Sequence, residues 1–93
     1  MTKINLEFPK SETRLAGFPY GEAVYNEQVK DKISFDGEIE IVFPNQIEKV
    51  ASSFVQGFFA AIVAAIGYKG VEQQINITSR SDSLTSSIRK NIY

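Results

Sequence analysis

The feature that most constrains this chain is an apolar stretch from Phe54 to Ile66, which only Gln56 and Gly57 interrupt. The stretch falls short of the roughly 20 apolar residues that a helix needs to span a bilayer. If the stretch is helical, apolar side chains lie on every side of the helix, and other parts of the protein or a partner must bury them. We therefore expect a buried helix at Ser53–Tyr68, and in a chain of 93 residues a partner surface could provide part of the cover.

Shorter segments alternate apolar and polar residues, which is typical of strands with one buried face. The alternation predicts strands at Thr2–Phe8, Glu38–Phe43 and Gln73–Ser79. Two further helices are predicted, at Pro19–Lys32 and at Ser81–Asn91. Proline suits the first turn of a helix, and Asp82 near the start of the last helix suits its positive end. The segments Lys10–Phe18 and Ile47–Val50 are predicted to be a loop and a connection.

The order of these elements, with a helix after each strand, favours parallel neighbouring strands joined by right-handed crossovers. Hydrophobic residues make up 43% of the chain, which is enough for a core. We predict one α/β domain spanning residues 1–93, in which helices pack against a mixed sheet of three to four strands.

The composition argues against catalysis and metal binding by the side chains of this protein. It contains no Cys and no His, so the usual ligands for zinc and the usual nucleophile–base pairs are missing. Glu38 and Glu40 share a strand face, which we interpret as a solvated outer face rather than an acid–base pair. We therefore predict a protein that is not an enzyme and has no metal site and no cofactor.

Charge and the N-terminal sequence bear on partners and location. The net charge is −1, and Arg80, Arg89 and Lys90 form only a small basic group, so nucleic-acid binding is not favoured. Residues 1–10 alternate polar and apolar residues instead of forming the apolar run of a secretory signal. We expect a cytoplasmic protein that does not bind membranes.

The segment Val50-Ala51-Ser52-Ser53-Phe54, which follows a strand and a turn and opens an apolar helix, resembles the STAS domain. In that family, which includes the anti-sigma factor antagonists, the corresponding pattern is Asp-Ser-Ser-Gly. Phe after the serines is more similar to a STAS-like family of unknown function, whose members often stand beside histidine-kinase-type ATPases. This chain departs from the antagonists, because Ala51 and Phe54 replace the Asp and the Gly.

The resemblance implies a regulatory module that docks a protein partner, namely a histidine-kinase-like ATPase or an anti-sigma-type kinase. Docking would use the helix N-terminus around Ser52 and Ser53, and Ser52 occupies the position of the phosphate acceptor. The alternative is that either serine only caps the helix, a role that serine favours in any protein. Tyr20 and Tyr25, together with Phe18, would form an exposed aromatic partner surface or else pack into the core.

Two other functions remain open. The apolar helix could complete the core of a homodimeric structural or assembly protein, since a small domain gains burial by pairing. The chain could also be a small bacterial phage or mobile-element inhibitor that uses this fold to block a host protein.

Overall fold

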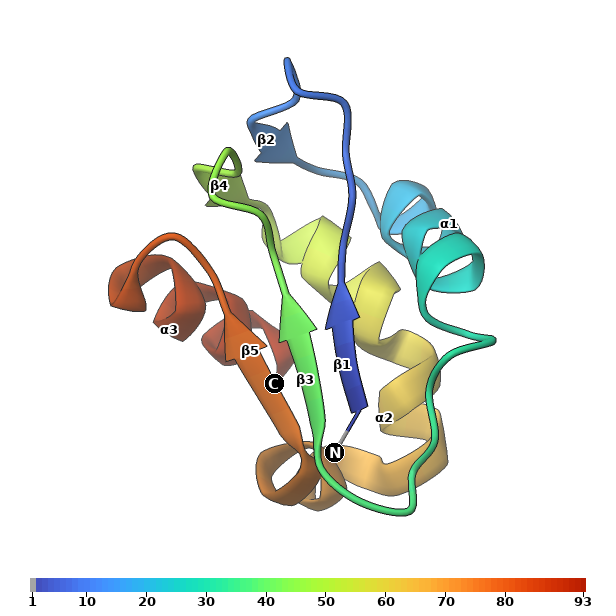
Figure 1. Cartoon of the computed structure of the whole chain (residues 1–93). Helices are drawn as coiled ribbons and strands as arrows, with labels where there is room; N and C mark the ends of the chain where they lie inside the picture. Colours follow the sequence, from blue (N-terminus) through green and yellow to red (C-terminus); the bar gives the residue numbers. More distant parts are fainter. Residues whose placement is uncertain (1) are drawn as a thin grey trace.

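The computed structural model describes residues 2–93, which form a three-stranded sheet, a separate two-stranded ladder and three helices (Figure 1). The elements are β1 (Thr2–Asn5), β2 (Arg14–Leu15), α1 (Phe18–Gln28), β3 (Ile39–Val42), β4 (Lys49–Val50), α2 (Ser52–Gln74), β5 (Ile75–Thr78) and α3 (Asp82–Ile92). The α/β class and all six predicted elements are confirmed, in the predicted order.

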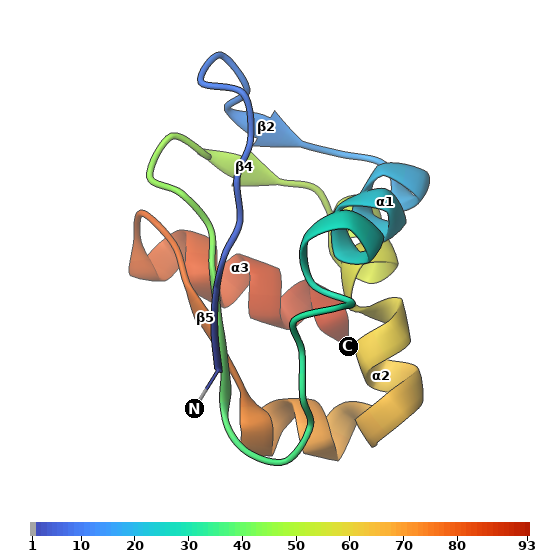
Figure 2. The same ribbon diagram turned by 45° about the vertical axis from the view of Figure 1, so that its right-hand side comes forward.

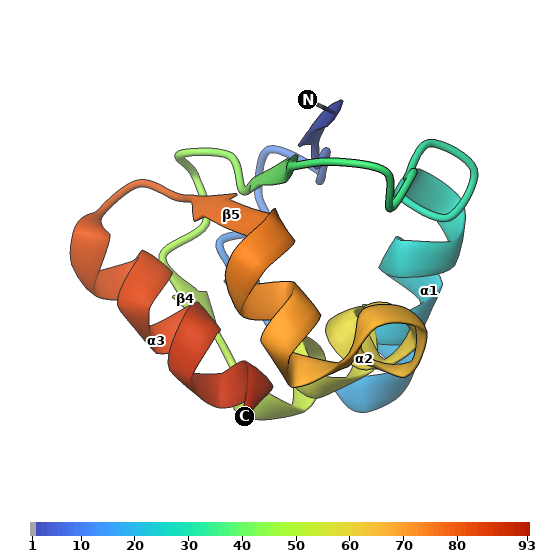
Figure 3. The same ribbon diagram turned by 90° about the horizontal axis from the view of Figure 1, so that it is seen from below.

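The larger sheet is parallel throughout and has the strand order β1-β3-β5, with Ile4 beside Ile41 and Ile41 beside Ile77. The connections from β1 to β3 and from β3 to β5 each contain a helix, and the strand order advances in one direction, so right-handed crossovers leave α1 and α2 on one face. Figure 3 shows the three helices on the same side of the strands. The prediction of a mixed sheet was therefore wrong, because no pair of strands within residues 2–93 is joined by a hairpin.

The opposite face of this sheet is open and polar. Apart from Val42, the side chains on it are polar, namely Lys3, Asn5, Glu40, Asn76 and Thr78, and the Thr78 hydroxyl donates to the Glu40 carboxylate at 2.7 Å. Parallel sheets are normally covered on both faces, and their strands are then apolar on both. The polar side chains here make an uncovered face compatible with water. Glu40 accordingly lies on the outer face, as predicted.

The free edges of the sheet each receive a side chain from a helix. At β1 the Gln28 amide of α1 accepts from the Glu7 N–H at 2.7 Å and donates to the Glu7 carbonyl at 2.8 Å. At β5 the Arg89 guanidinium of α3 donates to the Ile75 carbonyl. These bonds occupy backbone groups that strand pairing leaves unpaired.

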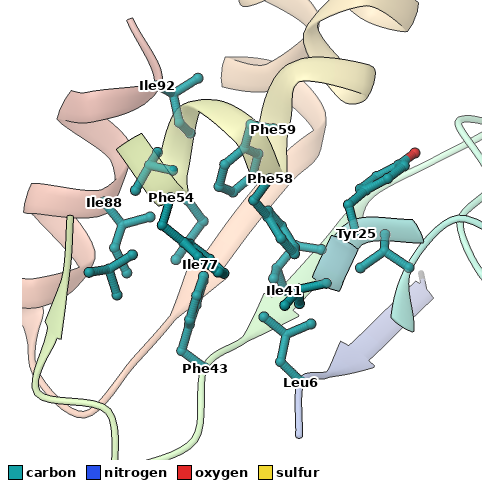
Figure 4. Packing of buried hydrophobic residues seen from close by; sticks show 14 of the residues in the cluster. Leu6, Tyr25, Ile41, Phe43, Phe54, Phe58, Phe59, Ile77, Ile88 and Ile92 are labelled. Atoms are coloured by element: carbon teal, nitrogen blue, oxygen red, sulfur yellow. The ribbon is translucent and has the colours of Figure 1, made fainter. Parts of the chain in front are cut away.

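The core lies between the sheet and the helices, and the Phe58 ring is at its centre (Figure 4). Its centroid is 4.9 Å from that of Phe59, 5.9 Å from Phe54, 6.0 Å from Tyr25 and 6.1 Å from Phe43. The molecule exposes 5382 Å². A folded monomer of 10.4 kDa exposes about 5400 Å². The single chain therefore buries as much surface as a monomer of its size is expected to bury.

Element ends differ from the predictions at several places. The first strand was predicted to reach Phe8 and ends at Asn5, and α2 runs past the predicted Tyr68 to Gln74. Gly67 interrupts α2 with φ 72° and ψ 171°, so its straight part covers residues 52–66. The ladder of β2 with β4 was predicted as loop and connection, because strands of two residues are too short to show alternation.

Candidate docking surface

The N-terminal ends of α1 and α2 are in direct backbone contact. A Cβ atom at Gly57 would overlap the Phe18 carbonyl, and one at Gly21 would overlap the Phe54 carbonyl and the Phe58 amide. Only glycine at both positions permits this approach, because any side chain would force the two helices apart. The two helix ends are therefore closely packed, and Figure 2 shows α1 crossing α2 there.

The two serines that begin α2 have different environments. The Ser53 hydroxyl accepts a hydrogen bond from the Gly17 N–H at 3.0 Å and so holds the turn before α1. Ser52 is exposed and has no side-chain hydrogen bond within residues 2–93. The N-cap is Ala51, without a side-chain capping bond, so the prediction that Ser52 or Ser53 caps this helix was wrong. By contrast, Ser81 is the N-cap of α3, and its hydroxyl accepts from the Leu84 N–H at 3.1 Å.

The aromatic residues of α1 divide between the surface and the core. Phe18 is 42% exposed and Tyr20 is 36% exposed, beside the start of α2. The Tyr20 ring meets the Phe54 ring edge-on at 5.6 Å, and its hydroxyl donates to the Glu12 carboxylate at 3.0 Å. Partial burial, together with this bond and the negative charges of Glu12 and Glu27, raises the pKa of Tyr20 to about 12.

Tyr25 is only 7% exposed and packs edge-on against Phe58, and burial raises the pKa of its phenol. Of the two alternatives drawn from the sequence, core packing therefore holds for Tyr25, and exposure holds for Phe18 and Tyr20. The structure brings Ser52, Ser53 and Tyr20 to one end of the molecule, and it places Tyr25 in the core. We call the surface formed by Phe18, Tyr20 and Ser52 the docking end.

A hollow of about 480 Å³ adjoins the docking end. Its lining comes from β2, β4, the residue before α2, and the first turns of α3: Arg14, Leu15, Ala16, Glu48, Lys49, Val50, Ala51, Ser81, Ser83, Leu84 and Ser87. We call it the β4–α3 hollow. Leu15, Val50 and Leu84 are buried and form an apolar floor, whereas Arg14 and Lys49 are exposed on the rim.

The sequence analysis did not identify Arg14 and Lys49, which become neighbours only through the register of β2 with β4. The sequence does contain a pattern that links the two residues. A basic, an aliphatic and an alanine residue stand in this order shortly before a helix in both Arg14-Leu15-Ala16 and Lys49-Val50-Ala51. Two of the three basic side chains noted near the C-terminus already have interaction partners in the chain. Arg80 lies 3.8 Å from the Glu48 carboxylate, and Arg89 bonds the Ile75 carbonyl.

The outer face of α2 has no charge as far as Tyr68. No charged residue occurs from Ala51 to Tyr68, and Ala61, Ala64 and Ala65 are exposed. A second hollow, of about 350 Å³, lies beside this face, next to the Tyr68 and Tyr93 rings, whose centroids are 5.5 Å apart.

By length and composition alone, α2 could cross a membrane. Its straight part spans about 22 Å, however, against a hydrocarbon core of about 30 Å. Its phenylalanines are also buried in the protein core. Within residues 2–93, no three His, Cys, Asp or Glu side chains are grouped so as to hold a metal ion.

In comparisons with known proteins, no family model matches this chain, and no curated protein or solved structure shows significant similarity to it.

Proposed function

We propose that this chain is a non-catalytic regulatory module that binds a protein partner through the docking end. The observation that carries the proposal is the rigid junction of α1 with α2, which presents Phe18 and Tyr20 to solvent beside an uncapped helix start. Exposed aromatic side chains supply much of the binding energy at protein interfaces. Holding them on a rigid support reduces the entropy lost on binding.

The resemblance of the Ser52-Ser53-Phe54 segment to STAS-like proteins supports the class of partner, a histidine-kinase-like ATPase or an anti-sigma-type kinase. It also supports Ser52 as a regulated residue. Ser52 is exposed and its side chain has no hydrogen bond to any of residues 2–93, whereas the Ser53 hydroxyl accepts from the Gly17 N–H. A phosphate on Ser52 would add charge in the middle of the docking end and would weaken docking of a closely packed partner.

The proposal is tested by capturing the partner from host lysate, purifying it and measuring its affinity for variants. Phe18→Glu and Ser52→Asp should each weaken binding at least tenfold, whereas Ser52→Ala should leave it unchanged. Ser86→Asp, which adds the same charge at an exposed position of α3, is the matched control. Equal binding by Phe18→Glu and the native chain would rule out the docking end.

Ser53→Asp is a poor control, because it would also break the bond from Gly17 and disturb the turn before α1. A loss of binding in that variant would not distinguish a change of charge from a change of structure.

A homodimeric assembly protein is the second candidate, and the uncharged outer face of α2 favours it. The exposed area weighs against it, because the monomer already buries the surface expected for its size.

A further inference from the structure

We propose that the β4–α3 hollow binds an acidic segment of the docked partner, with an apolar side chain on the floor and a carboxylate on the rim. This inference rests on the proposed function, and it adds the chemistry of the segment that the partner contributes. Three features of the hollow support it: the charge of the rim, the apolar floor, and the position beside the docking end.

The rim carries two cations that form no ion pair with any acidic side chain of residues 2–93. Arg14 and Lys49 are paired in register across β2 and β4, and both side chains are exposed. Glu48 is the acidic residue of the lining, and Arg80 already lies 3.8 Å from it. Within residues 2–93 this is the one ion pair, so neither Arg14 nor Lys49 has a carboxylate within 4 Å. The rim is therefore positive on a chain whose net charge is −1.

Two adjacent cations in a chain with a negative net charge attract carboxylates locally and repel other basic groups. A single arginine can bind a carboxylate with two parallel hydrogen bonds, and the neighbouring lysine adds a point charge. The rim thus selects an acidic occupant by charge.

The floor supplies the apolar half of the recognition. Leu15, Val50 and Leu84 form it, and Ser83 and Ser87 border it on α3 with hydroxyl groups. A volume of about 480 Å³ lies in the range of clefts that enclose small ligands or a few side chains. An occupant with an apolar side chain next to an acidic one would use both parts of the hollow.

The hollow is continuous with the docking end. Ala51 lines the hollow and directly precedes Ser52, and its N–H donates to the Leu15 carbonyl of β2 at 2.8 Å. A partner seated on Phe18 and Tyr20 could therefore extend a segment over Ala51 into the hollow. A phosphate on Ser52 would then stand close to the positive rim and would compete with the partner's carboxylate.

The test uses a display library of random heptapeptides selected on the immobilised full chain. We expect the selected peptides to pair an Asp or Glu with an apolar residue. The variant Arg14→Glu/Lys49→Glu should bind them at least tenfold more weakly, and Arg14→Gln/Lys49→Gln should give an intermediate loss. Lys3→Glu/Lys30→Glu makes the same change in net charge at exposed sites away from the hollow and should have no effect.

Amide chemical shifts locate the peptide, and we expect changes at Val50, Ser83 and Leu84. The proposal is overturned if no peptide is selected, if the selected peptides lack acidic residues, or if the charge reversal leaves their binding intact in a folded variant. It is also overturned if a random single-stranded oligonucleotide binds the hollow more tightly than the selected peptides.

The two proposals fail in different ways. If Phe18→Glu abolishes partner binding but the rim variants do not, the docking end stands and the hollow is not used. If the rim variants bind neither the peptides nor the partner while Phe18→Glu binds normally, the hollow stands and the docking end fails.

Discussion

The two parts of helix α2 contact the rest of the molecule differently. Residues 52–62 carry Phe54, Phe58 and Phe59 into the core and touch the backbone of α1 through Gly57. Residues 63–74 include exposed Ala64 and Ala65, and Gly67 breaks the helix there. As far as Tyr68, where the helix carries no charge, large side chains define the buried side and alanines define the exposed side. The first part presents the docking end, whereas the second part buries Val71 in the core and leaves Ala64 and Ala65 exposed.

The largest expected effect tests how firmly the first part is held. Gly57→Ala should lower the free energy of unfolding by about 2 to 3 kcal/mol, because the added Cβ would overlap the Phe18 carbonyl. Urea unfolding followed by circular dichroism measures this loss. Gly37→Ala is the matched control, since nothing lies within 4 Å of a Cβ at that position, and it should change stability by less than about 0.5 kcal/mol. Equal stability of the two variants would mean that α1 and α2 are not in tight contact.

A smaller effect separates the two serines of the docking end. Ser53→Ala should cost about 1 kcal/mol, because the Gly17 N–H loses its acceptor. Ser52→Ala should be close to neutral, because its side chain makes no hydrogen bond within residues 2–93. The same urea unfolding measurement compares the two variants. A greater cost for Ser52→Ala would instead identify Ser52 as the residue that stabilises the helix start.

The smallest effect concerns the outer face of α2. Ala64→Glu should change the unfolding free energy by less than about 0.5 kcal/mol, because Ala64 is exposed and Glu is a good helix former. Light scattering should give the mass of one chain, 10.4 kDa, for both the native protein and the variant. A native mass of twice that value, returning to one chain in Ala64→Glu, would replace this expectation with the homodimer.

Most of the fold followed from the sequence because alternation and apolar runs report burial directly. The strand Ile39–Val42 and the helix Asp82–Ile92 lie within two residues of their predicted ends for this reason. The cap of α2 was mispredicted, because serine is favoured at a cap in general, whereas here Gly17 competes for the Ser53 hydroxyl. The β4–α3 hollow was missed because it depends on pairing between residues 35 positions apart, Arg14 and Lys49.

The side-chain bonds at the two edges of the sheet bear on how this protein stays dispersed. A sheet with open edges can recruit strands from other molecules and grow into fibres. Gln28 occupies both backbone groups of Glu7 beside β1, and Arg89 occupies the Ile75 carbonyl of β5. Each bond thus obstructs the addition of a strand while tying a helix to the sheet. The residues that attach α1 and α3 to the sheet therefore also occupy backbone groups that an added strand would need.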